Sequence, residues 1–206
     1  MHWLAELDGR VLTVEIPATS ANLGAGYDCL AVALGLTNRV EVEVRGWSRG
    51  AIELAVLGEG QGELPSDRDN RFVRGLEAAL VEARGALPEG VGWRIEMQNR
   101  IPIARGLGSS AAATVGGLVA GNALAGEPLT HSDLLRLATA IEGHPDNAAA
   151  ALLGGFTVAA DLDGVVEAPA STPPVISVPS CSSPSAGCRR RTCARPCRPR
   201  CRSRTR

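Results

Sequence analysis

The sequence predicts an α+β fold in which strands and helices share a core of small aliphatic side chains. Strand-like segments gather in the first half of the chain, and helical segments come between and after them, without the regular alternation of a βαβ array. Hydrophobic residues make up 45% of the 206 residues, but aromatic residues only 3%. Because Ala, Val and Leu must then fill the interior, we expect close contacts between helices and strands.

Five segments have the alternating or short apolar pattern of β-strands. They are residues 10–16, 38–45, 51–57, 91–97 and 154–160. We expect the first strand to end at Pro17, since proline has no N–H to donate to a sheet. Residues 17–28 show no clear period and are rich in glycine and small polar residues, which predicts a loop with unusual backbone demands.

Four segments are predicted to be helices, namely residues 70–84, 109–125, 131–141 and 148–153. The first has apolar residues at helical spacing and is followed by Gly85, which predicts its end. The second consists almost wholly of Ala, Val, Leu and Gly, so we expect it to be central, with Ser109 or Ser110 as its cap. Thr130 and Asp133 form the capping pattern of the third helix.

A glycine-rich turn leads directly into the second predicted helix. Its glycines let the backbone approach a ligand closely, and the first N–H groups of a helix lie at the positive end of its dipole. Such a turn is a site for an anion, most often phosphate. A tight turn before a packed helix would use the same residue types, so that alternative stays open. The segment comprises Pro102, Ile103, Ala104, Arg105, Gly106, Leu107, Gly108, Ser109, Ser110, Ala111 and Ala112.

The composition excludes several classes of phosphate-binding protein. All 21 basic residues are Arg, so there is no Lys for a Walker loop or for the nucleotide contact of protein kinases. The chain also lacks a Rossmann Gly-x-Gly-x-x-Gly between a strand and a helix, and a Gly-x-Ser-x-Gly elbow. A bound phosphate would therefore be held by backbone amides, Ser hydroxyls and Arg105.

Charge divides the chain after residue 168. Residues 1–168 hold all 22 acidic residues and 12 of the 21 basic ones, whereas residues 169–206 hold nine Arg and no acidic residue. This tail has neither a strand nor a helix period, so we expect it to be disordered. It holds five of the six cysteines, without a Cys-x-x-Cys pair or a His, which disfavours a zinc site. A shifted reading frame would explain the abrupt change, and a tail that binds nucleic acid without specificity is the alternative.

Neither a membrane segment nor a secretory signal is expected. No stretch of 18 apolar residues is present. The first residues lack the basic and apolar regions of a signal peptide. We therefore expect a cytoplasmic protein, in which a disulfide framework is disfavoured as well.

Three segments together resemble the homoserine kinases, a family in the superfamily of galactokinase, homoserine kinase, mevalonate kinase and phosphomevalonate kinase. The segments are residues 17–28, residues 102–112, and residues 142–147 with Gly154, Gly155 and Phe156. The middle segment marks the superfamily, whereas the other two are similar to homoserine kinases in particular. Ala25 and Tyr27 stand where the family usually has Pro and Phe. The resemblance covers about residues 8–168.

The resemblance implies a fold and a domain organisation. Residues 1–168 would form a kinase N-terminal domain, similar to the ribosomal protein S5 domain 2-like fold, that binds ATP and substrate. The family's ferredoxin-like C-terminal domain is missing from this sequence. We interpret residues 169–206, rich in Arg, Cys and Pro, as a frameshifted tail that interrupts the family pattern near Pro173.

The resemblance also implies roles for the site residues. ATP would bind residues 102–112, with its phosphates at Gly106, Gly108, Ser109 and Ser110. Mg²⁺ would bind the Ser110 hydroxyl and the Glu142 carboxylate, which are the hard oxygen ligands that this ion takes. L-Homoserine would contact Asn22, Asp28, His144 and Asp146. The family is held to need no dedicated catalytic base, so none is assigned.

The implied reaction transfers the γ-phosphoryl group of ATP to the hydroxyl of L-homoserine and gives O-phospho-L-homoserine, a step in threonine biosynthesis. Catalysis would rest on positioning and charge neutralisation. The resemblance implies no membrane partner and no specific nucleic acid, and it leaves a homodimer open.

Two other functions stay open at this point. One is a different small-molecule kinase of the superfamily, such as a mevalonate-type kinase, which residues 144–147 disfavour. The other is an inactive remnant whose Arg-rich tail binds polyanions. Single residues also fit structural roles: Asn22 and Asp28 as turn residues, Asp146 as a helix cap, and Glu142 as a solvated helix end.

Overall fold

The computed structural model describes residues 8–45, 50–87, 90–162 and 165–171. They belong to a first compact unit that ends at Pro174, and the second unit, from Val175 onward, lies wholly outside them. The elements in chain order are β1 (Val11–Leu23), β2 (Gly26–Arg45), β3 (Ile52–Gly58), α1 (Arg71–Arg84), β4 (Gly92–Asn99), α2 (Ser109–Leu124), α3 (His131–Glu142), α4 (Asp146–Leu153), β5 (Phe156–Val158), β6 (Ala160–Leu162), β7 (Val165–Glu167) and β8 (Ala170–Ser171).

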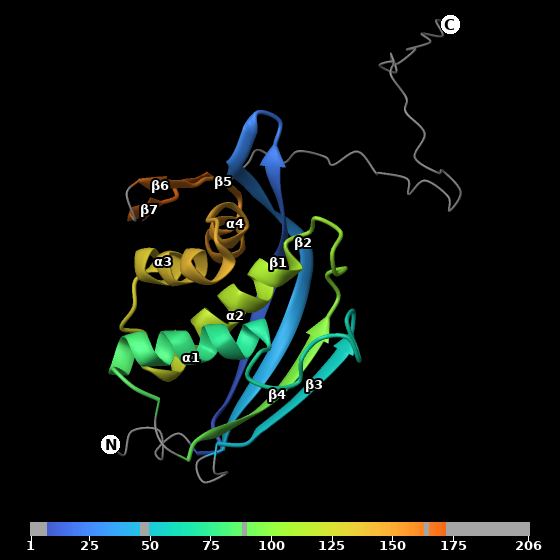
Figure 1. The fold of residues 1–206 in the computed structure, drawn as a ribbon, viewed down its shortest axis with the longest axis vertical. Helices are drawn as coiled ribbons and strands as arrows, with labels where there is room; N and C mark the ends of the chain where they lie inside the picture. The colour runs from blue at the N-terminus through green and yellow to red at the C-terminus, as the bar shows by residue number, and fades with distance from the viewer. Residues whose placement is uncertain (1–7, 46–49, 88–89, 163–164, 172–206) are drawn as a thin grey trace, which may run out of the picture. The chain divides into compact units, whose positions relative to one another are not determined.

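Two layers make up the described part, a mixed sheet and a group of helices on one face of it (Figure 1). The long strand β2 lies at the centre of the sheet. It pairs antiparallel with β1 along most of its length, with β4 through residues 39–45, and with β5 through residues 30–32. Strand β3 joins β4 in parallel, β8 joins β5, and β6 and β7 form a separate hairpin. The predicted α+β class is confirmed.

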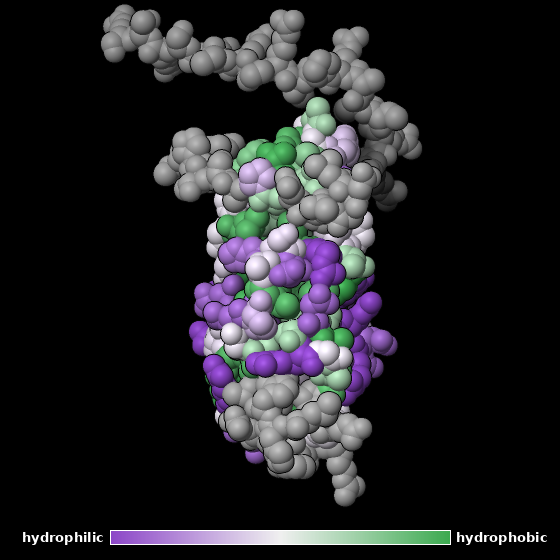
Figure 2. Space-filling model, turned by 90° about the vertical axis from the view of Figure 1, so that its left-hand side faces the viewer, coloured by the Kyte–Doolittle hydropathy of each residue, from purple (hydrophilic) through white to green (hydrophobic). Residues whose placement is uncertain are grey.

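The core lies between the sheet and the helices. Alternate side chains of two neighbouring strands are buried against the helices, as the period of a strand requires; they are Val40, Val42 and Val44 of β2 and Trp93, Ile95 and Met97 of β4. The helices contribute Phe72, Leu76 and Leu80 of α1 and Leu118 of α2. The core is aliphatic, as the composition predicts, except for Trp93 and Phe72, which are its largest fully buried side chains. On the outer side of the helices, bands of hydrophilic side chains alternate with smaller hydrophobic areas (Figure 2).

Helices α1 and α2 pack with their backbones in close approach because glycine stands at the contact. A Cβ atom at Gly117 would collide with the backbone carbonyl of Phe72, and one at Gly121 with that of Leu76. In return, a Cβ atom at Gly75 of α1 would collide with the carbonyl of Thr114. This contact fixes α2, and with it the turn that precedes α2.

The prediction that the first strand ends at Pro17 and that residues 17–28 form a loop is wrong. Strand β1 continues to Leu23, and β2 begins at Gly26, so the segment is a β-hairpin. Strand β1 pairs only with β2 among the described strands, and proline is tolerated on such an edge strand. The register shifts at two places in the hairpin, and these irregularities break the period that would have marked the strand.

The predicted ends of α1 and α3 are confirmed. The side chain of Asn70 accepts the Phe72 N–H at 2.9 Å, and Gly85 ends α1 with a φ of 83°. At the start of α3, Thr130 and Asp133 form a complete capping box.

Two other boundaries differ from the prediction. Helix α4 begins at Asp146 rather than at residue 148, because Gly143 ends α3 and Pro145 leads directly into the next helix. The single strand predicted for residues 154–160 is divided between β5 and β6.

The described structure extends beyond residue 168, where the sequence analysis placed the domain boundary. Ala170 and Ser171 form β8 and pair with Thr157 and Phe156 of β5. The rest of the predicted tail, with its nine Arg and five Cys, lies outside the described residues. No helix within the described segments is long and apolar enough to cross a membrane.

The close contact of α1 and α2 predicts a strong effect of a small substitution. Gly117→Ala should lower the free energy of unfolding by about 1–3 kcal/mol, because the added methyl group must push the two helix backbones apart. Gly35→Ala is the matched control: nothing lies within 4 Å of a Cβ atom there, and the φ of Gly35 is not positive. Urea unfolding measures both, and equal effects of the two substitutions would contradict this packing.

The capping box of α3 predicts a pH dependence. Hydrogen bonds from the Thr130 hydroxyl and N–H, aided by the charge of Arg136, lower the pKa of Asp133 below its ordinary value of 3.8. A carboxylate with a lowered pKa in the folded state stabilises the fold above its unfolded pKa, and this contribution is lost as the pH falls through the folded value.

The stability difference between the wild type and Asp133→Asn should therefore be largest near neutral pH and should shrink below about pH 4. Unfolding titrations across this range measure the difference. Ser132→Ala, an exposed change on the same helical turn, should leave a difference that does not depend on pH. A constant difference for Asp133→Asn would show that the charge of this residue contributes nothing.

Candidate functional site

The glycine-rich turn is held at its start by a buried side chain of β2. Asn38 accepts the N–H groups of Arg100 and Ile101 with its Oδ1 atom, at 2.7 and 2.9 Å. Asn38 is almost fully buried, so these two bonds anchor the chain where it leaves β4.

Beyond that anchor, residues with positive and negative φ alternate along the turn. Ala104, Gly106 and Gly108 have φ values of 55°, 71° and 64°, and the residues between them have negative φ. This alternation is typical of a nest, in which successive N–H groups point into one concavity that suits an anion. An Ala in this conformation costs roughly 1–2 kcal/mol, so the turn is held against local strain, as ligand-binding segments often are.

Helix α2 begins without a side-chain cap. Its N-cap is Gly108, and neither Ser109 nor Ser110 caps it, so the prediction of a serine cap is wrong. The first N–H groups of a helix have no partner inside the helix. They lie beside the nest and add the positive end of the helix dipole to it.

The Ser110 hydroxyl bonds to the end of α3 instead. It donates to Oε2 of Glu142 at 2.8 Å, while Oε1 of Glu142 accepts from the Thr114 hydroxyl at 2.6 Å and from Arg71 at 3.4 Å. The Glu142 side chain is only 7% exposed, so it is not a solvated helix end. Oε1 is held by two donors, whereas Oε2 has one hydroxyl partner that can turn away.

A second carboxylate, that of Asp146 at the start of α4, is fully buried. Oδ1 of Asp146 accepts the Asn147 N–H at 2.7 Å and lies 2.9 Å from Nδ1 of His144. The other oxygen, Oδ2, is buried and has no hydrogen-bond partner among the described residues. A buried carboxylate oxygen without a donor is costly, which marks it as a place for a ligand that brings one.

The structure brings Asn22 and Asp28 together at the tip of the hairpin. Oδ1 of Asn22 accepts the Asp28 N–H at 2.9 Å, and both residues have positive φ, of 57° and 53°. Within the described residues, no hydrogen bond or ion pair links this tip to His144 or Asp146. The four residues predicted to contact one substrate therefore form two separate pairs.

Thr19 joins the three segments that carry the sequence motifs. It lies in the first segment, is fully buried, and donates its N–H to the Leu107 carbonyl of the second at 3.1 Å. Its hydroxyl donates to Oδ1 of Asn147, in the third segment, at 2.7 Å. A Cβ atom at Gly108 would collide with this hydroxyl, so the turn rests directly on Thr19.

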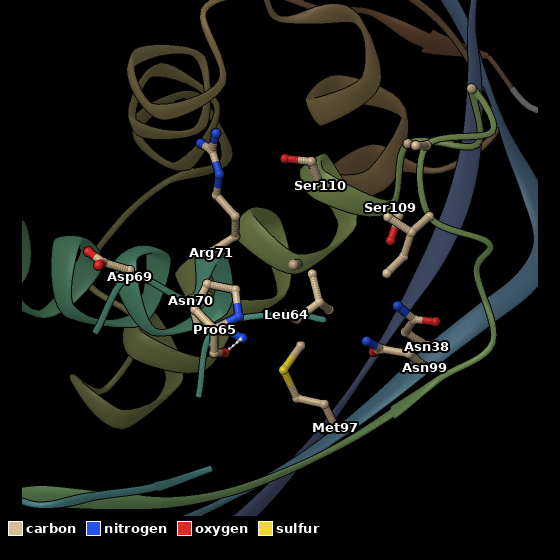
Figure 3. Close-up of a pocket in the computed structure, with 15 residues that line it drawn as sticks. Asn38, Leu64, Pro65, Asp69, Asn70, Arg71, Met97, Asn99, Ser109 and Ser110 are labelled. Carbon is tan, nitrogen blue, oxygen red and sulfur yellow. Dashed lines mark hydrogen bonds between the residues drawn. The ribbon is translucent and has the colours of Figure 1, made fainter. Parts of the chain in front are cut away.

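A cavity of about 450 Å³ opens beside the glycine-rich turn (Figure 3). Its wall includes apolar side chains such as Leu64, Pro65 and Met97, together with Ser109 and Ser110. The remaining lining residues are Asn38, Asp69, Asn70, Arg71, Asn99, Ile103, Ala104, Gly106, Gly108 and Ala113.

Sequence reasoning did not select the residues that β2, β4 and the start of α1 contribute to this wall. Asn99 is one of them: it is 6% exposed, and its amide nitrogen donates to the Glu59 carbonyl at 3.2 Å. Its Oδ1 atom is buried without a partner among the described residues. A polar residue at a position where the alternation of the strand predicts burial, three residues before Pro102, was the available signal.

No group of three His, Cys, Asp or Glu side chains in the described segments is placed to hold a metal ion by itself. Ser110 and Glu142 supply one hydroxyl and one carboxylate, so a metal ion there would need further oxygens from a ligand.

Residues 70–155 match the family described as the GHMP kinases N-terminal domain. The homoserine kinase of Corynebacterium efficiens is 49% identical over 150 residues, which is 73% of this chain and 47% of that protein. The homoserine kinase of Carboxydothermus hydrogenoformans is 49% identical over 148 residues, which is 72% of this chain and 47% of that protein. The chain thus spans about half the length of the curated relatives it matches.

The solved structures that resemble this chain include a homoserine kinase as well. A putative homoserine kinase from Listeria monocytogenes has a TM-score of 0.63 at 34% identity, and the similarity covers 80% of this chain and 55% of that one. The mevalonate kinase of Methanococcus jannaschii has a TM-score of 0.55 at 20% identity, and the similarity covers 77% of this chain and 56% of that one. At this identity the comparison shows a shared fold alone.

The position of Thr19 predicts that the loss of one hydroxyl loosens the glycine-rich turn. Thr19→Val keeps the shape of the side chain but leaves Asn147 without its donor, so unfolding should become easier by about 1–2 kcal/mol. Amide hydrogen exchange of residues 104–110 should also become faster. Thr157→Val is the control, because that buried hydroxyl makes only a 3.4 Å bond to Ala31. Unchanged exchange in Thr19→Val would show that Thr19 does not hold the turn.

Proposed function

We propose that the chain, in which residues 70–155 match the GHMP kinases N-terminal domain, belongs to that superfamily and supplies the ATP- and substrate-binding half of a homoserine kinase. The reaction would be transfer of the γ-phosphoryl group of ATP to the hydroxyl of L-homoserine, which gives O-phospho-L-homoserine. The observation that carries the proposal is the junction at Thr19, where the phosphate-type turn and the segment with the buried Asp146 carboxylate meet. A phosphoryl donor and an amino-acid acceptor could thus be held side by side.

The turn supports binding of the ATP phosphates. Its nest at residues 104–108 and the uncapped start of α2 offer backbone N–H groups and a positive dipole end. Ser109 and Ser110 add hydroxyls at the cavity wall. Arg105 is exposed on the same turn, where it can approach a phosphate from outside. Since the chain has no Lys, these groups take the role that a lysine has in other kinases.

The adjacent cavity supports a purine base. Leu64, Pro65 and Met97 offer apolar surface to the faces of a flat ring. The unpartnered Oδ1 of Asn99 is an acceptor at the wall of the same cavity. The exocyclic amine of adenine is a matching donor, and its bond would satisfy an oxygen that otherwise stays buried and unpaired.

Ser110 and Glu142 fit a magnesium ion that the nucleotide brings with it. Among the described residues, only the Ser110 hydroxyl engages Oε2 of Glu142, so a turn of that hydroxyl leaves two oxygens for a cation. Phosphate oxygens and water would complete the set, as is usual for this ion. When bound, Mg²⁺ supplies neutralisation of charge on the β- and γ-phosphates. Thr114 and Arg71 keep the carboxylate oriented through its other oxygen.

The buried Asp146 supports recognition of the homoserine ammonium group. Oδ2 lacks a donor in the described structure, and an ammonium group supplies both a positive charge and N–H donors. His144 and the Asn147 N–H fix the carboxylate through Oδ1. Asn22 and Asp28 form a second polar pair at the hairpin tip for the same substrate. We place the reaction in the cytoplasm, where it leads toward threonine.

A turnover assay with the full chain tests the proposal. ADP release should require ATP, Mg²⁺ and L-homoserine together, and mevalonate should not replace homoserine. Calorimetric titration with ATP and with homoserine gives binding constants that do not depend on turnover.

Asp146→Asn removes the negative charge at nearly constant shape. It should weaken homoserine binding at least about tenfold, the value of a charged hydrogen bond, and leave ATP binding unchanged. Asp133→Asn, which removes a carboxylate at the exposed start of α3, serves as the control. Absence of both ATP binding and turnover, together with salt-sensitive binding to DNA, would replace the proposal with the inactive remnant.

A further inference from the structure

Arg71 stands at the cavity wall, and its contact with Glu142 accounts for only part of its guanidinium group. It is the first residue of α1, directly after the Asn70 cap, and its side chain reaches across to the end of α3. Figure 3 shows it at the same end of the cavity as Ser110, whose hydroxyl points toward it. Among the described residues that line the cavity, it is the one with a positive charge.

Only one corner of the guanidinium group is engaged. Nη1 donates to the Ile141 carbonyl at 3.0 Å and to Oε1 of Glu142 at 3.4 Å. Nε and Nη2 make no hydrogen bond or ion pair to any described residue. The side chain is 42% exposed and lines the cavity, so a ligand in the cavity can reach it.

The contacts of Arg71 differ from those of an arginine that only neutralises a carboxylate. An arginine that serves a carboxylate alone tends to form two parallel N–H···O bonds with it. Here a single nitrogen is divided between the carboxylate and a backbone carbonyl, and the longer of the two contacts goes to Glu142. The contacts hold the guanidinium in place and leave the rest of its fork for another anion.

The charge balance of the cavity identifies that anion. Asp69 in the cavity wall and Glu142 beside Arg71 are negative, and nucleotide phosphates would add several further negative charges. The chain contains no Lys, and Arg105 does not line the cavity. A guanidinium fork matches two phosphate oxygens in geometry as well as in charge.

We propose that Arg71 binds the terminal phosphates of the nucleotide, and that Glu142 and the end of α3 hold it ready for them. This proposal rests on the proposed function, since it assumes that the cavity takes a nucleotide. It adds a fixed cation to the cavity wall near Ser110, so that the phosphates would meet a guanidinium group as well as backbone N–H groups.

Binding measurements with the full chain test the proposal without any need for turnover. The ligands are ATP, adenosine and inorganic tripolyphosphate, each titrated by calorimetry at two salt concentrations. Arg71→Met keeps most of the length of the side chain and removes the charge, and Arg71→Lys restores a charge without the fork. Arg74→Met is the matched control, because Arg74 lies one turn along on the exposed side of α1.

Arg71→Met should weaken ATP and tripolyphosphate at least about tenfold, leave adenosine unchanged, and reduce the salt dependence of ATP binding. Arg71→Lys should recover part of the loss, and Arg74→Met should bind like the wild type. Equal ATP affinity in Arg71→Met and the wild type would overturn the role of Arg71 while the nucleotide site stands. An equal loss for ATP and adenosine would overturn it too, since it would show a structural role. A wild type that binds none of the three ligands would refute the proposed function itself.

Discussion

The site depends on one buried residue of an edge strand. The backbone N–H of Thr19 donates to the glycine-rich turn and its hydroxyl donates to Asn147, so three segments that are far apart in the sequence meet at one residue. The register of β1 against β2 shifts between Pro17 and Thr19, directly before the residue whose N–H bonds to the Leu107 carbonyl of the turn. Gly108 completes the junction, because a larger residue would collide with the hydroxyl.

Local patterns predicted most of the regular elements. The spacing of apolar residues in α1, with Gly85 after its last residue Arg84, and the capping box of α3 are patterns of nearby residues, so sequence reasoning found them. The hairpin of residues 17–28 was missed because its bulges break the alternating period, and because Pro17 marks a strand end only in the interior of a sheet. The notion of a serine cap failed for a tertiary reason: Ser110 is drawn to Glu142, which is 32 residues away.

The motif segments predicted the candidate anion site, but not the cavity beside it. The turn has a signature in its own sequence, whereas the cavity wall gathers residues from β2, β4 and the approach to α1, none of which share a motif. Asn99 and Arg71 can be assigned a role only once the fold shows that both line this cavity. Residues whose role is set by distant neighbours are those that a single sequence does not reveal.

The unpartnered oxygen of Asp146 also affects how firmly the chain is folded. A buried acceptor without a hydrogen-bond donor lowers the free energy of unfolding by roughly 1–3 kcal/mol. A ligand that brings an N–H group and a positive charge to this oxygen removes the penalty, and because it binds the folded state alone it shifts the folding equilibrium by mass action. The supply of the small molecule would then govern how much of the protein is folded, as well as how much of it is occupied.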